Sequence, residues 1–188
     1  NGSTDGSTEF LLSQERTNVF RTDDSYHSAF SGMVWVNHLK SMLSPFAWVL
    51  YVDVDEGLVY DGCEKHSIPD LVESLDMVGE EAFTAFMLDM FSTRTLSPKT
   101  SARDVDYFAR YTSYLPDLNT TPKPVCPYIQ TLGGLRSLFK TGEELTKTPL
   151  IKSSNGIDFL HSSHNISTAR VSEKSGVLLH YKFVDGLV

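Results

Sequence analysis

The stretch WVLYVDVDEGLVY, residues 48–60, joins an apolar run to three acidic residues, Asp53, Asp55 and Glu56. The run from Ala47 to Val54 is rich in β-branched and aromatic residues, which predicts a strand buried on both faces, as in a parallel sheet. Three like charges at this spacing repel one another, so a positive partner is expected beside them. The stretch therefore predicts an interior strand that ends at a cation-binding edge of a sheet.

The rest of the chain alternates between helix and strand patterns. Residues 9–14, 32–43 and 67–79 have helical spacing: Ser7 or Thr8 is the expected N-cap of the first helix, and Ser67 and Gly79 are expected to bound the third. Residues 92–127 predict long loops with one short helix around 104–111. Strands are expected at 17–20, 82–89, 133–140, 145–152 and 176–184. This order predicts an α/β fold whose C-terminal part is antiparallel.

Composition limits the classes of protein and partner. A chain of 188 residues with 40% hydrophobic residues is the size of a single domain, here 1–188. A net charge of −8 argues against nucleic acid as a partner and favours a cation or a neutral polar substrate. No apolar run is long enough for a transmembrane segment, so a soluble chain is expected. Cys63 and Cys126 lack the spacing of a zinc site or a disulfide framework.

The acidic cluster suggests divalent-cation chemistry. On a strand, Asp53 and Asp55 project to the same side of the backbone and can converge on one ion, for which oxygen ligands favour Mg²⁺ or Mn²⁺. Open α/β sheets bind ligands at the carboxyl ends of their strands, where this pair is expected. The alternative is an exposed acidic turn without a ligand.

Two enzyme classes use a DxD at such a position. In haloacid-dehalogenase-type phosphatases Asp53 would be the nucleophile toward phosphate, but Glu56 delays the glycine by one place and Leu58 replaces the expected Thr or Val. In nucleotide-sugar transferases the pair holds an ion that neutralises the departing diphosphate. A non-catalytic nucleotide- or glycan-binding module is a third possibility.

Seven segments taken in order resemble the family 2 type of glycosyltransferase with the GT-A fold. They are NGSTDGS (1–7), GMVWVN (32–37), WVLYVDVDEGLVY (48–60), AFMLDMF (85–91), GGLRSLF (133–139), LTKTPL (145–150) and VLLHYKF (177–183). More narrowly, they are similar to a bacterial subgroup with DxDE and a late LHxKF.

The resemblance implies a GT-A-like (Rossmann-like) mixed sheet flanked by helices, with an antiparallel C-terminal part. In that family the NGSTDGS turn follows the second strand, so the first strand, its helix and the second strand are expected to precede Asn1. The implied activity is metal-dependent inverting transfer of a sugar from a nucleotide-diphosphate donor to a hydroxyl of a glycan or lipid-linked glycan. The implied cofactor is Mn²⁺ or Mg²⁺, and the implied location is the cytoplasm, at or near the inner face of the membrane.

The same resemblance suggests roles for individual residues. Asp55 would be the direct metal ligand, Asp53 would lie near the ribose and the ion, and Glu56 would orient its neighbours. Asp5 would lie beside the nucleotide; an ordinary turn is the alternative.

Two residues of the late LHYKF segment are candidates for the donor site. On a strand His180 and Lys182 would point the same way, offering an imidazole for the ion and an ammonium for phosphate oxygens. A late histidine often completes the metal site in GT-A enzymes, which makes His180 the expected third ligand and Lys182 the expected diphosphate contact. A structural histidine on an apolar strand is the alternative.

Asp89 and Arg136 complete the set of candidate site residues. An inverting transferase needs a base, and Asp89 ends an apolar strand where burial would raise its pKa. A helix cap or a buried hydrogen-bonding Asp is the alternative. Arg136, after two glycines, could bind a phosphate or an acidic partner, and a tight bulge with a surface arginine is the competing interpretation.

Overall fold

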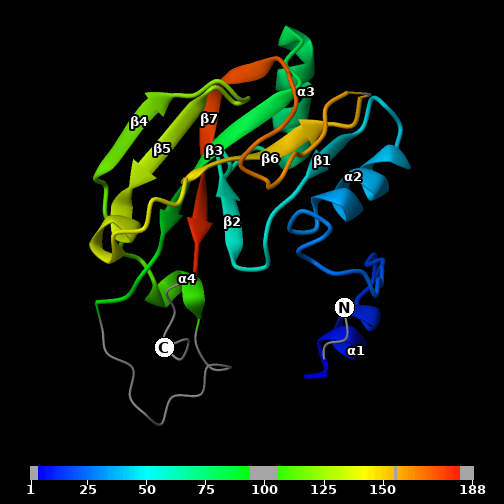
Figure 1. Cartoon of the computed structure of the whole chain (residues 1–188), viewed down its shortest axis with the longest axis horizontal. Helices are drawn as coiled ribbons and strands as arrows, with labels where there is room; N and C mark the ends of the chain where they lie inside the picture. Colours follow the sequence, from blue (N-terminus) through cyan, green and yellow to red (C-terminus); the bar gives the residue numbers. More distant parts are fainter. Residues whose placement is uncertain (1–3, 94–105, 155, 183–188) are drawn as a thin grey trace.

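The structure, a computed structural model, describes residues 4–93, 106–154 and 156–182. It is a mixed α/β fold with two sheets: a curled five-stranded mixed sheet in the order β1-β6-β3-β7-β2, and a separate antiparallel pair, β4-β5 (Figure 1). The strands are β1 (Trp48–Leu50), β2 (Glu56–Val59), β3 (Ala82–Asp89), β4 (Leu118–Pro122), β5 (Ile129–Gly133), β6 (Thr146–Lys152) and β7 (Val171–His180). The helices are α1 (Ser7–Leu12), α2 (Met33–Ser41), α3 (Ile68–Val78), α4 (Tyr107–Arg110) and a 3₁₀ helix, η2 (Gly134–Phe139).

The centre of the main sheet is β3. It pairs antiparallel with β6 on one side and parallel with β7 on the other, and nearly all of its residues are buried. This confirms the interior strand expected at 82–89. The strand expected at 145–152 is present as β6. The strand expected at 176–184 is present in part as β7, which begins earlier, at Val171, and ends at His180; residues 183 and 184 lie outside the described residues.

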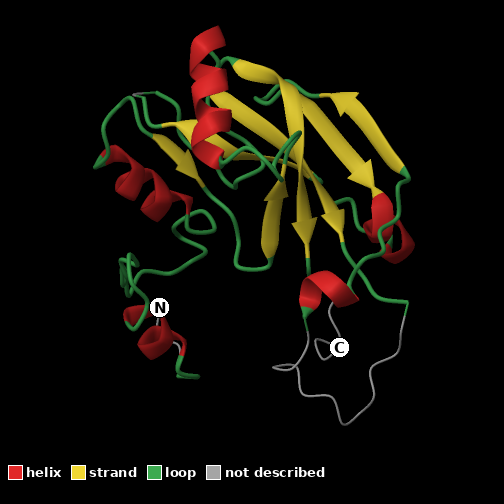
Figure 2. Ribbon diagram, turned by 180° about the vertical axis from the view of Figure 1, so that it is seen from behind, coloured by secondary structure: helices red, strands yellow, loops and turns green. Residues whose placement is uncertain are grey.

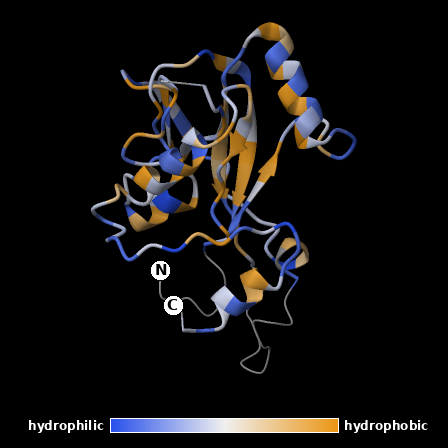
Figure 3. Cartoon of the chain, turned by 90° about the vertical axis from the view of Figure 1, so that its right-hand side faces the viewer, coloured by the Kyte–Doolittle hydropathy of each residue, from blue (hydrophilic) through white to orange (hydrophobic). Residues whose placement is uncertain are grey.

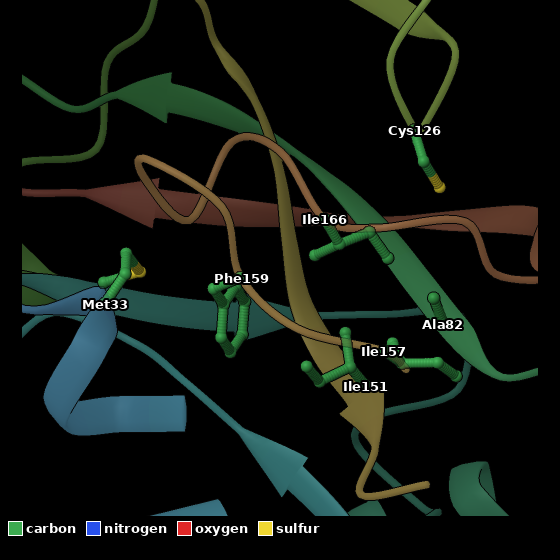
Figure 4. Packing of buried hydrophobic residues seen from close by; sticks show 7 residues of the cluster. All are labelled: Met33, Ala82, Cys126, Ile151, Ile157, Phe159 and Ile166. Atoms are coloured by element: carbon green, nitrogen blue, oxygen red, sulfur yellow. The ribbon is translucent and has the colours of Figure 1, made fainter. Parts of the chain in front are cut away.

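Both faces of the sheet are covered. Ala82 and Ile151 belong to a buried cluster that extends through Phe159 to Met33 of α2 (Figure 4), and the alternate residues Phe83 and Leu150 belong to a second cluster with Leu75 of α3. Because successive strand residues point to opposite faces, the two helices lie on opposite sides of the sheet. Figures 2 and 3 show this arrangement from two further directions, and the colours of Figure 3 show apolar residues concentrated in the strands.

The strand that leads into the acidic cluster differs from the prediction. β1 has three residues and pairs with β6 in antiparallel orientation. Among the described residues it forms one edge of the sheet. The expected interior strand of a parallel sheet is therefore wrong here. The chain leaves β1 at Tyr51, passes along the ends of β6, β3 and β7, and turns through Asp53–Glu56 into β2 at the opposite edge.

The helices follow local signals closely. α3 begins after Ser67, which forms a capping box with Asp70, and ends at Gly79 in the left-handed conformation. α2 also matches its expected segment. α1 is capped by Gly6 instead of Ser7 or Thr8, and none of its residues is buried.

Three other local predictions are wrong. Residues 134–139, within the strand expected at 133–140, form η2 instead, because Gly133 and Gly134 both have positive φ (118° and 57°), which turns the chain out of an extended path. Residues 17–20 are not a strand. The expected loop region 92–127 contains β4, whose partner β5 was also not expected. Within the described part, no helix combines the length and apolar character needed to cross a membrane.

Candidate functional site

The candidate site lies where β3 and β7 end and the turn at Asp53–Glu56 crosses them. Strand pairing sets this meeting point, because His180 at the end of β7 is paired with Asp89 of β3 on one side and with Glu56 of β2 on the other. The backbone N–H of Tyr181 donates to the carbonyl oxygen of Asp55 at 2.9 Å, which holds the turn against the end of β7. Three segments far apart in the sequence therefore present polar side chains to one place.

His180 lies between two carboxylates. Its Nδ1 is 2.5 Å from Oδ1 of Asp89, and its Nε2 is 3.5 Å from Oδ2 of Asp55. The imidazole side chain is 8% exposed, whereas that of Asp55 is 38% exposed. The structure thus brings the predicted ligands His180 and Asp55 together, with Asp55 on the solvent side.

A second cluster surrounds Lys147 of β6. Its ammonium donates to Oδ2 of Asp53 at 2.7 Å and to Oε1 of Glu56. Oε2 of Glu56 also accepts the backbone N–H of Asp53 at 3.0 Å, and the hydroxyl of Tyr51 donates to Oδ1 of Asp53 at 3.1 Å. Lys147 is therefore the positive partner of the acidic cluster, and Glu56 orients its neighbour.

These contacts explain why the Asp53 carboxyl is ionised. Partial burial raises the pKa of the Asp53 carboxyl, but the hydrogen bond and the positive charge of Lys147 outweigh it and hold the pKa below its ordinary value. Burial and the adjacent Asp53 carboxylate raise the pKa of the Tyr51 phenol. At neutral pH Asp53 is an ionised acceptor and Tyr51 a neutral donor.

The predicted three-ligand set of Asp53, Asp55 and His180 is not assembled. Among the described residues no group of three or more His, Cys, Asp or Glu side chains could hold a metal ion. Both oxygens of Asp53 already accept from Lys147 and Tyr51. An Asp55 oxygen and Nε2 of His180 could serve as two ligand atoms for Mn²⁺ or Mg²⁺, with phosphate oxygens or water in the remaining coordination positions.

Asp89 and Arg136 form a buried pair. Nε of Arg136 donates to Oδ2 of Asp89 at 2.8 Å and Nη2 donates to Oδ1 at 3.2 Å; the Asp89 side chain is 1% exposed. Burial raises the pKa of Asp89, but hydrogen bonds from His180 and Arg136 bring it below the ordinary value. The expected rise in pKa is therefore wrong, and so is the interpretation of Arg136 as a surface residue.

The other two predicted contacts, Lys182 and Asp5, are both exposed. Lys182 follows the end of β7 and is not part of the strand, so the two-residue repeat expected to align it with His180 does not extend to it. Asp5 accepts the backbone N–H of Ser7 at 3.1 Å, and hydrogen bonding from the side chain and the backbone of Ser7 lowers the pKa of its exposed carboxyl. Figure 1 shows α1, which follows Asp5, set apart from the ends of β3 and β7.

Sequence reasoning did not identify Lys147 as part of the site. The sequence feature that could have identified it is the position of Lys147 inside the expected strand LTKTPLIK, because a lysine buried there without a carboxylate partner would be costly.

Comparison with known proteins found no matching family model, no matching curated protein and no matching solved structure.

Proposed function

We propose that this chain is a metal-dependent inverting glycosyltransferase of the GT-A type. Its donor is a nucleotide-diphosphate sugar, and its acceptor is a hydroxyl of a glycan or lipid-linked glycan. The observation that carries the proposal is the 3.5 Å approach of His180 Nε2 to Asp55 Oδ2 at the end of the central strands. A mixed sheet with a helix on each face, as observed, supports the same fold type.

Under this proposal the acidic residues have distinct tasks. Asp55 and His180 would hold the divalent ion, which would supply the positive charge that a departing diphosphate requires. Asp53 is 46% exposed and ionised, and Lys147 and Tyr51 fix its position, so it can accept a hydrogen bond from a sugar hydroxyl of the donor. Asp89 is less suited to be the base than expected, because its side chain is only 1% exposed and its pKa lies below the ordinary value.

Isothermal titration with Mn²⁺ and a panel of UDP and GDP sugars tests the proposal. Asp55→Ala should weaken metal-dependent donor binding at least about tenfold, as expected for loss of one of two protein ligands. Asp61→Ala removes an exposed aspartate at another position and is the matched control. Donor binding that is unchanged in Asp55→Ala, or independent of Mn²⁺ in the wild type, would refute the proposal.

One observation favours a phosphatase as a second candidate. A nucleophilic aspartate must be ionised and accessible, and Asp53 is both, with a cation beside it. Such an enzyme would form a fluoride-trappable aspartyl phosphate analogue at Asp53 and hydrolyse phosphate esters without a nucleotide. If the chain is a phosphatase, Asp53→Asn should abolish hydrolysis. If it is a glycosyltransferase, the wild type itself should show no phosphatase activity.

A further inference from the structure

A buried chain of hydrogen bonds runs from Arg136 through Asp89 to His180. The side chains are 7%, 1% and 8% exposed, respectively, so water competes little for these contacts. η2 supplies Arg136, β3 supplies Asp89 and β7 supplies His180. Three separate elements therefore contribute to one polar network directly behind the Asp55 carboxylate.

The distances identify which ring nitrogen of His180 carries a proton. A carboxylate can only accept, and the contact of Nδ1 with Asp89 is 2.5 Å, against 3.5 Å for Nε2 with Asp55. In the neutral ring the proton therefore lies on Nδ1, and the lone pair of Nε2 faces the Asp55 side chain. A histidine that binds a metal ion needs such a free lone pair.

We propose that Asp89 and Arg136 are positioning residues that hold His180 in the tautomer with Nε2 free to bind the metal ion together with Asp55. This inference rests on the proposed function for the identity of what Nε2 binds. Arg136 contributes because its guanidinium grips both oxygens of Asp89 and so fixes the plane of the carboxylate. Glu143 accepts from Nη1 of Arg136 at 3.2 Å and restrains the other side of the guanidinium.

An Asp89→Asn substitution should reverse the tautomer. Nε–H and Nη2–H of Arg136 both donate to Asp89, but an amide offers only one oxygen. The shorter contact, that of Nε with Oδ2 at 2.8 Å against 3.2 Å for Nη2 with Oδ1, should be kept, so the amide oxygen takes the place of Oδ2. The amide NH₂ then takes the place of Oδ1 and loses the contact with Nη2. This NH₂ faces Nδ1 of His180, which must then accept, and the ring proton moves to Nε2. The nitrogen that faces Asp55 loses its lone pair although the ring stays in place.

Two measurements test this on the full chain. Nitrogen-15 NMR of labelled histidine at pH 9 should show the proton of neutral His180 on Nδ1 in the wild type and on Nε2 in Asp89→Asn. Electron paramagnetic resonance with Mn²⁺ should show a dissociation constant about 10–100-fold higher in Asp89→Asn, the usual range for loss of a partner behind a metal ligand.

Controls separate positioning from simple loss of stability. Lys40→Met removes another buried cation, paired with Asp158 at 3.0 Å, and should leave both the His180 signal and Mn²⁺ affinity unchanged. Arg136→Lys keeps a carboxylate at Asp89, so the proton should stay on Nδ1 while Mn²⁺ affinity falls less than in Asp89→Asn. If Asp89→Asn does not fold, the wild type and Arg136→Lys still decide the tautomer.

The possible failures are distinguishable. A wild-type protein that does not bind Mn²⁺ contradicts the proposed function, and the NMR result then still decides whether Asp89 sets the tautomer. A neutral wild-type ring protonated on Nε2, or an Asp89→Asn protein with wild-type Mn²⁺ affinity, overturns the positioning role.

Discussion

Replacement of Lys147 by Met should destabilise the protein strongly. The substitution removes the ammonium that binds Asp53 at 2.7 Å and also binds Glu56, whose side chain is 0% exposed. Glu56 would keep one hydrogen bond, from the backbone of Asp53. Breaking a buried ion pair by removing one partner costs about 3–5 kcal/mol. For a protein of this size that corresponds to a Tm lower by roughly 6–20 °C.

Urea unfolding followed by circular dichroism measures this loss. Lys152→Met on the same strand is the matched control, because Lys152 is paired with the exposed Asp76 and should cost less than about 1 kcal/mol. The double variant Lys147→Met with Glu56→Gln should recover part of the loss, because no uncompensated buried charge then remains. A loss in Lys147→Met no larger than in the control would refute the view that Lys147 neutralises the acidic turn.

Three further predictions concern pH and packing. The pKa of the Asp89 carboxyl is lowered from 3.8 in the folded protein. Its contribution to the free energy of unfolding is therefore complete above pH 3.8 and is lost as pH falls through the lower pKa of the folded state. In urea unfolding, the stability of Asp89→Asn should decline less steeply below pH 4 than that of the wild type. Burial lowers the pKa of the His164 imidazole from 6.5 to about 4. As pH drops through that interval the unfolded chain binds a proton at His164 before the folded chain does, so the free energy of unfolding falls, by up to about 3 kcal/mol. The stability of His164→Gln should fall less between pH 6.5 and 4, and parallel curves of stability against pH for the variant and the wild type would contradict this. Gly176→Ala would place a Cβ 2.8 Å from the carbonyl oxygen of Val59 and should lower the free energy of unfolding by about 1–3 kcal/mol, which a shift in the urea midpoint would reveal.

The elements that the sequence predicted well have strong local signals. α3 carries Ser67 before it and Gly79 after it, so both ends follow from capping chemistry. β3 is almost continuously apolar, and its central position follows from that pattern. The meeting of His180 with the acidic turn was also expected, but from the family resemblance: the pattern placed His180 inside a strand at 176–184, whereas β7 ends at this residue.

The parts that were not predicted depend on contacts between distant segments. β1 has the composition of an interior strand, but its pairing with β6 alone sets its position, and composition does not encode a pairing partner. The salt bridges of Lys147 with Asp53 and of Arg136 with Asp89 likewise join residues far apart in the chain. Asp89 was therefore expected to have a raised pKa from burial alone, whereas the hydrogen bonds from His180 and Arg136 that lower the pKa come from distant segments of the chain.

The charge balance around His180 has a kinetic consequence. Among the described residues that form the contacts around His180, the carboxylates of Asp53, Asp55, Glu56, Asp89 and Glu143 outnumber the permanent cations Lys147 and Arg136. Each of these two cations is already bound by a carboxylate. A polyanion that approaches this end of the sheet alone meets excess negative potential, so its association should accelerate as salt screens the repulsion. Under the proposed function the order of arrival is then set by electrostatics: a diphosphate associates rapidly only when a divalent cation accompanies or precedes it.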